Sequence, residues 1–314
     1  MISVLRYDFV RLIATGRELP SNGGLPVIPA SFDYHRPKST PEALSLLGQY
    51  GDDARVVAGG HSLIPMMKLR LAQPAHLVDL CAISELKGIR FDGNAVVIGA
   101  MTTQAELLAS AQLTAAVPIL RETALQIADP QVRYLGTLGG NVANGDPGND
   151  MPAVMQCLDA IYRVIGTSGA RNIKAREFYK SAFVTALNSG EIVTAVEIPM
   201  PAPKHGFAYE KLKRKIGDYA TAAAAVMMTV AGGKVQSCSI ALTNLAPTPV
   251  YAAQASADVV GTSLDHAAIT AAAGAAGALM APSADGRGTV QFRTSVGGVM
   301  LGRALQRAFQ RAGA

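Results

Sequence analysis

Between residues 40 and 200 the hydrophobic positions follow two alternating spacings. A helix is predicted near Thr40, the expected N-cap, because Pro41 suits the first helical position and apolar residues follow at helical spacing. The same spacing predicts further helices over 62–71, 102–109, 116–128 and 150–158. Short apolar runs typical of strands lie between them, at 55–58, 76–80, 95–99, 160–165 and 192–198. This part of the chain is predicted to be mixed α/β.

Three prolines, Pro199, Pro201 and Pro203, interrupt the pattern and indicate a domain boundary. Beyond them, a hairpin pattern with a Gly232-Gly233 turn predicts three antiparallel strands, at 207–215, 220–230 and 235–242. Helices are expected to follow at 252–260, 265–280 and 294–311. The predicted fold class is therefore α+β, with three parts: an extension over 1–26, a first domain over 27–202 and a C-terminal domain over 203–314.

The last predicted helix has two different faces. Arg303, Arg307 and Arg311 recur every fourth position, so they are expected to share an exposed face. The opposite face is expected to be buried and carries Val299, Ala304, Leu305 and Phe309.

The composition favours an ordered chain that works in the cytoplasm. Hydrophobic residues make up 49% of it and charged residues 16%, and without Trp the core must pack through small side chains. The stretch 267–284 is rich in Ala and Gly and only weakly apolar, which favours a buried helix of a soluble protein over a membrane span. Charges interrupt the N-terminal stretch where an export signal needs an apolar core, so a cytoplasmic location is expected.

Charge and cysteine content both argue against two common classes of function. The net charge of +5 is dispersed, and its densest cluster, at 211–215, lacks the aromatic residues expected in a nucleic-acid binder. Cys81, Cys157 and Cys238 lie far apart with no CxxC pair, so reduced thiols are expected, with no iron–sulfur cluster or metal on this chain.

The first candidate ligand loop, VAGGHSL at 57–63, joins a predicted strand to a predicted helix. Gly59 and Gly60 let the backbone approach an anion and adopt positive φ, and the amides of a helix N-terminus favour a diphosphate. Ser62 adds a hydroxyl donor. A plain structural turn explains a pair of glycines after a strand equally well.

The second candidate loop, residues 136–150, is the stronger signal. It has five glycines in fifteen residues, with Thr, Asn and Asp between them. A mere connector does not need so many permissive residues together with hydrogen-bonding side chains. Asp150 is the expected N-cap of the next helix, or else accepts hydrogen bonds from a ribose or an adenine amino group. Valine at Gly139 or Gly140 is expected to fill the space of the diphosphate.

Two other nucleotide motifs are missing from the chain. There is no GxxxxGK[ST], which excludes a P-loop. Gly136, Gly139 and Gly140 do not form GxGxxG after a strand, so the site is not of the Rossmann type.

The segments AGGHSLIPMMK and GTLGGNVANGDPGNDMPA resemble the FAD-binding medium subunits of molybdenum hydroxylases, especially those of the aerobic carbon monoxide dehydrogenase type. IPASFDYHRPKS, VIGAMTTQ, IADPQVRYLGT and YEKLKRKIGDYATAAAAV extend the resemblance over nearly the whole chain after residue 26. It implies a PCMH-type FAD-binding domain of the vanillyl-alcohol oxidase superfamily, made of two α/β subdomains, followed by a C-terminal domain with a three-stranded antiparallel sheet and helices.

The resemblance also assigns residues to FAD. Those expected at the diphosphate and the adjoining chain are Ala58, Gly59, Gly60, His61, Ser62 and Leu63, with Thr137, Leu138, Gly139, Gly140 and Asn141. Asp150 matches a carboxylate that contacts the adenosine part, and Tyr219 an aromatic side chain against the isoalloxazine. Val193 and Lys211 match an apolar and a basic contact, with Glu210 as the alternative to Lys211.

A histidine in a turn like that of His61 is bonded to the flavin in some oxidases of the superfamily, but medium subunits hold FAD non-covalently, so non-covalent binding is expected. The implied partners are a large subunit with the molybdenum cofactor and a small subunit with two [2Fe–2S] clusters, in a dimer of heterotrimers. FAD would then pass electrons to an external acceptor, a quinone at the inner face of the membrane, and no residue of this chain is catalytic.

Three alternatives remain open at this point. The chain is a medium subunit for a substrate other than carbon monoxide, a self-sufficient FAD-dependent oxidase, or a scaffold whose loops are only structural. An oxidase needs a general base over the ring. The five histidines, at 35, 61, 76, 205 and 266, form no cluster near a second motif.

Overall fold

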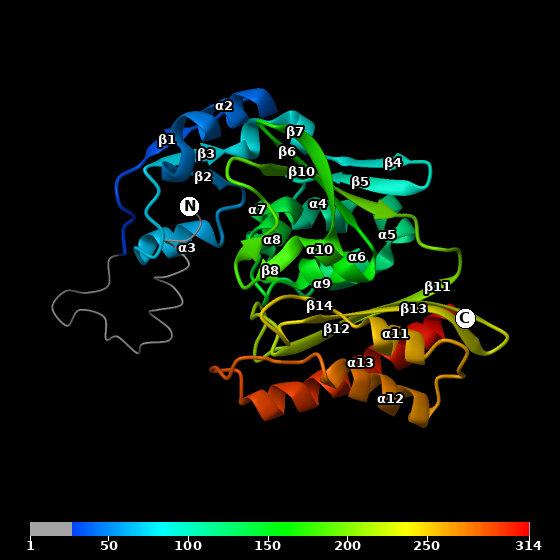
Figure 1. Cartoon of the computed structure of the whole chain (residues 1–314). Helices are drawn as coiled ribbons and strands as arrows, with labels where there is room; N and C mark the ends of the chain where they lie inside the picture. The colour runs from blue at the N-terminus through cyan, green and yellow to red at the C-terminus, as the bar shows by residue number, and fades with distance from the viewer. Residues whose placement is uncertain (1–26, 314) are drawn as a thin grey trace.

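The computed structural model describes residues 27–313, so the prediction of an extension over 1–26 lies outside the described residues. The first subdomain is a parallel three-stranded sheet in the order β1-β3-β2, at the left of Figure 1. Its strands and helices are β1 (Asp33–His35), α2 (Thr40–Tyr50), β2 (Ala54–Val57), α3 (Leu63–Lys68) and β3 (His76–Asp79).

Helix α2 begins as the sequence predicts, apart from its cap. The N-cap is Ser39, whose side chain accepts a hydrogen bond from the Glu42 N–H, and Thr40 is already helical. The prediction of Thr40 as the cap is wrong by one residue, because Ser and Thr stand side by side and either hydroxyl suits the position.

The second subdomain has an antiparallel five-stranded sheet in the order β4-β5-β10-β6-β7. Its strands are β4 (Ile89–Asp92), β5 (Ala95–Gly99), β6 (Ile161–Gly166), β7 (Gly169–Lys174) and β10 (Ile192–Pro199). Short helices cover one face of it: α4 (Gln104–Ala109), α5 (Ala111–Ala116), α6 (Pro118–Ala124), α7 (Pro130–Leu135), α8 (Leu138–Ala143), α9 (Asp150–Cys157) and α10 (Ala175–Phe178). A small hairpin, β8 (Tyr179–Ser181) and β9 (Val184–Thr185), follows α10.

The C-terminal domain has a four-stranded antiparallel sheet in the order β11-β12-β13-β14. Three strands match the predicted ones: β11 (His205–Leu212), β12 (Ala222–Ala231) and β13 (Lys234–Thr243). The expectation of three strands is corrected by β14 (Val250–Tyr251), which is too short to leave a pattern in the sequence. The helices are α11 (Ala253–Asp258), α12 (His266–Gly277) and α13 (Val290–Ala312).

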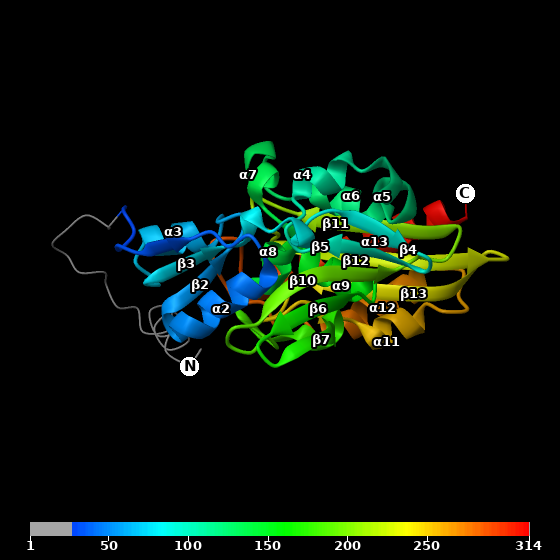
Figure 2. The same ribbon diagram turned by 90° about the horizontal axis from the view of Figure 1, so that it is seen from above.

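The two larger sheets and their helices form four layers, which Figure 1 shows from top to bottom and Figure 2 from above. The helices α4, α5, α6, α8 and α9 pack between the five-stranded and the four-stranded sheet, and α11–α13 cover the other face of the latter. Strand β12 is buried on both faces, which explains why its sequence is a continuous small apolar run without polar alternation. Gly206 of β11 packs so close to α13 that a Cβ would lie 1.8 Å from the Ala308 carbonyl oxygen.

Two helical expectations need correction. Val299 of α13 is 50% exposed, because it lies beyond the edge of the stripe that faces the sheet, whereas Ala304 and Leu305 are buried and Phe309 is partly buried. Helix α12 lies at the surface and buries only Ala272 and Ala276 fully, so it is not the buried helix expected there. No helix within residues 27–313 is long and apolar enough to cross a membrane.

Candidate cofactor site

The two glycine loops contact each other through their backbones. The first loop runs from β2 into α3, and a Cβ on Gly59 would lie 2.4 Å from the Leu135 carbonyl oxygen and 2.8 Å from Gly136 Cα. Gly60 has φ +73°, a conformation that glycine adopts without strain. The geometry of the first loop therefore requires glycine at both positions. This requirement favours a specialised loop over the plain structural turn that the sequence also allowed.

The first loop has amides available for an anion. Within the described residues, the N–H groups of Gly60, His61 and Ser62 have no hydrogen-bond partner, and Ser62, at the N-cap of α3, makes no capping bond with its side chain. His61 is exposed, and Ala58, Ser62 and Leu63 are half-buried. Successive free amides beside a helix N-terminus suit a diphosphate.

The second loop contains a helix that the sequence analysis missed. Thr137 is the N-cap of α8, and its Oγ1 accepts from the Gly140 N–H at 3.0 Å. The Leu138 and Gly139 amides donate to the carbonyls of Thr102 and Ala100. The first amides of α8 are therefore already bonded, and the first loop, the weaker signal in the sequence, offers the freer donors.

Gly139 and Gly140 have different roles. A Cβ on Gly139 would lie 2.5 Å from Ala100 Cβ and 2.7 Å from its carbonyl oxygen, inside the protein. A Cβ on Gly140 would face Thr137 Oγ1 at 2.9 Å and Ala58 Cβ at 3.5 Å, between the two loops. Gly140 thus lies between the two loops, where a cofactor-facing role stays a prediction, whereas Gly139 is required by the packing of α8 on the end of β5.

The second loop leaves one polar atom for a ligand and is joined to α9. Asn141 Oδ1 is buried without a hydrogen-bond partner in the described part of the chain, which is costly unless something else donates to it. The Asn149 side chain donates to the Asn141 carbonyl oxygen at 2.8 Å. Asn149 is the N-cap of α9, so the expectation that Asp150 is the cap is wrong.

Asp150 is instead the first helical residue and the centre of a buried cluster. Its Oδ2 accepts from Lys211 Nζ at 2.8 Å and its Oδ1 from the Tyr209 hydroxyl, with both partners on β11. The side chains of Asp150 and Lys211 are only 6% and 1% exposed. Burial raises the pKa of the Asp150 carboxyl, while Lys211 and Tyr209 act in the opposite direction. Glu210 points away from Asp150 and pairs with Arg307, so of the two candidates Lys211 belongs to this cluster.

Tyr219 lies near the Asp150 cluster and beside Gly148 of the second loop. A Cβ on Gly148 would be 2.8 Å from Tyr219 Cδ1, and the residue Tyr219 remains 40% exposed. Partial burial, together with the carboxylates of Asp146 and Asp150, raises the pKa of Tyr219 to about 12. The Arg287 guanidinium lies 5.7 Å from the ring centroid. An exposed aromatic ring beside the buried Asp150 cluster can cover a flat ligand.

The other predicted residues form the wall behind the loops. Leu138 is fully buried and Val193, on β10, is 5% exposed, and both belong to the core beneath α8. The sequence analysis missed Asn149, Tyr209, Gly148 and Asp146. Tyr209 had a detectable signal, because it is two residues from Lys211 and so lies on the same face of β11.

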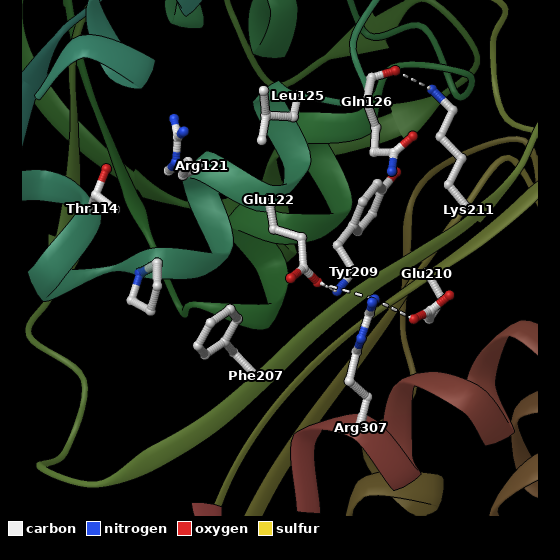
Figure 3. A pocket seen from close by; sticks show the side chains of 11 residues that line it. Thr114, Arg121, Glu122, Leu125, Gln126, Phe207, Tyr209, Glu210, Lys211 and Arg307 are labelled. Carbon is white, nitrogen blue, oxygen red and sulfur yellow. Dashed lines mark hydrogen bonds and ion pairs between the residues drawn. The ribbon is translucent and has the colours of Figure 1, made fainter. Parts of the chain in front are cut away.

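Three contacts along the edge of β11 attach the C-terminal domain to α6 and the residues after it, and Figure 3 shows those of Tyr209 and Lys211. Glu122 Oε1 accepts from the Tyr209 N–H at 2.7 Å, the Gln126 carbonyl oxygen accepts from Lys211 Nζ at 3.2 Å, and Gln126 Oε1 accepts from Lys213 Nζ at 2.7 Å. Glu122 also pairs with Arg311 of α13 at 2.8 Å. These contacts fix where Lys211 and Asp150 lie relative to the loops.

We expect Glu122→Ala to destabilise the chain by about 1–3 kcal/mol, because it leaves the Tyr209 N–H without its acceptor and the Arg311 guanidinium with only the Phe207 carbonyl oxygen. Glu210→Ala is the matched control, since Glu210 pairs with the partly exposed Arg307, and about 0–1 kcal/mol is expected. Urea unfolding curves of both variants measure the difference. Equal midpoints for the two would contradict this role of Glu122.

A comparison with known families decides which ligand the site takes. The profile of the family described as the FAD binding domain in molybdopterin dehydrogenase matches residues 30–201. The chain belongs to this family. A second profile, the CO dehydrogenase flavoprotein C-terminal domain, matches residues 207–308. The FAD-binding fold expected from the sequence is confirmed, and FAD is the cofactor of this subunit.

Similar proteins cover the chain almost completely. The carbon monoxide dehydrogenase medium chain of Afipia carboxidovorans is 59% identical over 91% of this chain and 99% of its own, and that of Hydrogenophaga pseudoflava is 47% identical with the same coverage. A crystal structure of the Cu,Mo-CO dehydrogenase contains a chain that is 60% identical, with a TM-score of 0.90, 90% of this chain covered and 99% of that one. The chain is thus a medium subunit of the oxidoreductase type, and its partners are large and small subunits.

The residues present fit FAD. The amides at 60–62, which have no partner within residues 27–313, suit the diphosphate, Asn141 Oδ1 needs a donor, and Tyr219 offers a ring face. Within residues 27–313, no three His, Cys, Asp or Glu side chains are arranged to hold a metal ion.

Proposed function

We propose that this chain is the electron-exit subunit of a complex that oxidises carbon monoxide with water to carbon dioxide. Substrate is oxidised at molybdenum on the large subunit, and the small subunit's two [2Fe–2S] clusters deliver the electrons to FAD on this chain. The observation that carries the proposal is the pair of glycine loops in backbone contact, whose amides at 60–62 have no partner in the described part of the chain, together with 59% identity to a carbon monoxide dehydrogenase medium chain over nearly the whole length. Bound FAD supplies the redox chemistry, and the protein positions it.

We further propose how FAD lies on the described residues. Residues 58–63 and 137–141 hold the diphosphate non-covalently, His61 included, and Tyr219 covers the isoalloxazine. Asp150 accompanies Lys211 at the flavin end and not at the adenosine, because Lys211 Nζ is 2.8 Å from it and Asp150 raises the pKa of Tyr219. Val193 supports the wall from beneath. The proposed domain limits are 27–202 and 203–314.

The proposed surroundings of the subunit are a dimer of heterotrimers in the cytoplasm, peripheral to the inner face of the membrane, where a quinone takes the electrons from FAD.

We expect a complex carrying Gly59→Val in this chain to lose FAD, since the new side chain would collide with the Leu135 carbonyl. Carbon monoxide should still reduce its clusters, as seen by the cluster spectrum, while quinone reduction is lost. Quinone reduction at the normal rate without FAD would contradict the exit role.

A second candidate is the same role in a complex with another substrate. It is favoured by the medium chain of glyceraldehyde dehydrogenase from Sulfolobus acidocaldarius, 34% identical over 88% of this chain and 98% of its own. A quinoline 2-oxidoreductase from Pseudomonas putida contains a 33% identical chain with a TM-score of 0.87, which covers 91% of this chain and all of that one. The active-site loop of the large subunit encoded alongside distinguishes the two, since a cysteine suited to a copper–molybdenum centre indicates carbon monoxide.

A further inference from the structure

A tight turn at 285–288, in the segment between α12 and α13, is closed by two backbone hydrogen bonds between its first and last residues. Arg293 of α13 is buried and anchors this segment. Its guanidinium donates to three backbone carbonyl oxygens, those of Thr221, Ser283 and Asn244. Because Thr221 is two residues from Tyr219, the same side chain fixes both the segment with the turn and the end of the loop that carries Tyr219.

Arg287 extends from this turn to the ring of Tyr219. Its Cζ lies over the ring, 5.7 Å from the centroid. A cation is attracted by an aromatic face up to roughly 6 Å from the centroid. Nη1 of Arg287 donates to Asp285 Oδ2 at 2.7 Å, and Nη2 lies 3.8 Å from Asp218 Oδ1. Two carboxylates on different loops thus hold the guanidinium where it meets the ring.

Ion pairing alone does not account for the place of Arg287. Its Nε is buried and has no acceptor in the described part of the chain. Arginine and carboxylate commonly pair through two parallel hydrogen bonds, as Arg171 does with Glu191. Arg287 makes no such pair with Asp218 or Asp285, and it lies over an aromatic ring instead. Contact with Tyr219 is therefore the feature that its position serves.

Arg287 and the second glycine loop restrict how the Tyr219 ring can meet a flat ligand. Arg287 covers one face, and Gly148 packs against the ring edge, since a Cβ there would lie 2.8 Å from Tyr219 Cδ1. Tyr219 is nevertheless 40% exposed, so the part of the ring that these contacts leave uncovered is available to stack on a ligand. The orientation of the ring is thus set before a ligand binds.

We propose, on the basis of the FAD placement proposed above, that Arg287 is a positioning residue of the flavin site and holds the Tyr219 ring against the isoalloxazine. Its guanidinium stays charged at every physiological pH, so the contact is permanent. Through this contact the segment between α12 and α13, which is distant in sequence from both glycine loops, contributes to the cofactor site.

Arg287→Gln removes the charge and keeps a polar side chain. In the assembled FAD-loaded complex, the fluorescence emission per bound FAD reports the ring, because a tyrosine stacked on the isoalloxazine quenches it by electron transfer. The iron–sulfur clusters are the same in every variant, so their quenching cancels in the comparison. We expect Arg287→Gln to retain FAD and to raise the emission about 2- to 30-fold, the change in ring population that one cation–π contact supports. Arg287→Lys keeps a cation and should restore most of the quenching.

Arg214→Gln is the matched control. Arg214 also pairs with Asp218, at 2.9 Å, and donates to the Gly286 carbonyl oxygen of the same turn at 3.0 Å. Of the two arginines, only Arg287 lies over the Tyr219 ring, and the Arg214 side chain is 52% exposed. Because exposed ion pairs contribute little, we expect unchanged emission in this variant.

Tyr219→Leu tests whether Arg287 acts through the ring. Alone it should raise the emission, and adding Arg287→Gln should then change nothing further, because the ring is already gone. Unchanged emission in Arg287→Gln, an equal rise in Arg214→Gln, or a further rise in the double variant would overturn the proposal. A wild-type complex without FAD, or normal quenching in Tyr219→Leu, would refute the proposed function or its FAD placement, and this proposal with it.

Discussion

Asp150→Ala is expected to destabilise the chain by about 3–5 kcal/mol, the usual cost of removing one partner of a buried ion pair. The variant leaves Lys211 Nζ, on a side chain that is 1% exposed, with only the Gln126 carbonyl as acceptor, and it leaves the Tyr209 hydroxyl with only the long contact of 3.4 Å to Thr243 Oγ1. The free energy of unfolding from urea titration measures the effect.

Glu197→Ala serves as the control for Asp150→Ala. Glu197 pairs with Arg163 at 2.6 Å, but the two side chains are 25% and 40% exposed, so a loss of about 0–1 kcal/mol is expected. The double variant Asp150→Ala with Lys211→Met should recover part of the stability, because it leaves no buried charge unpaired. A loss in Asp150→Ala no larger than in Glu197→Ala would show that the pair is not buried as described.

Gly139→Val is the second change with a large expected effect. Its Cβ would lie 2.5 Å from Ala100 Cβ and 2.7 Å from the Ala100 carbonyl oxygen, and both atoms belong to rigid structure at the end of β5. Overpacking in a core costs about 1–3 kcal/mol or more, and here α8 must move away from the sheet. We expect a lower melting temperature whether or not FAD is added.

Gly140→Ala is the matched comparison, because its Cβ meets only Thr137 Oγ1 and Ala58 Cβ between the two loops. This variant should lower the melting temperature of the FAD-free chain less than Gly139→Val does, because only the Thr137 hydroxyl has to shift, and it should bind FAD more weakly, as fluorescence titration would show. If instead Gly139→Val melted normally and lost only FAD, its glycine would face the cofactor and the packing role assigned to it would be wrong.

The sequence predicted the fold class and most long elements, since their apolar spacing is set by burial on one side. It missed the helices α5, α7, α8 and α10 and the strands β1, β4, β7, β8, β9 and β14. Each of these helices has 6 residues or fewer, and α8 contains two glycines, which have poor helix propensity. Strand β7 exposes most of its side chains, so it lacks the alternation that indicates a strand.

The site was predictable where chemistry is local and not where it depends on tertiary contacts. The glycine loops were found because glycine spacing is visible in the chain. The pairing of Asp150 with Lys211, 61 residues away, depends on how the C-terminal sheet packs against α9, and no local pattern reports that. For the same reason, the different roles of Gly139 and Gly140 became clear only from their neighbours in space.

The most direct test of the central claim is the flavin content of the purified chain after acid precipitation. We expect one FAD per chain, released into the supernatant, because hydrogen bonds from the amides at 60–62, which have no partner among the described residues, and to the side chain of Asn141 would hold it without a covalent bond. Flavin retained in the pellet would contradict non-covalent binding. A colourless protein that takes up no added FAD would contradict the cofactor site itself.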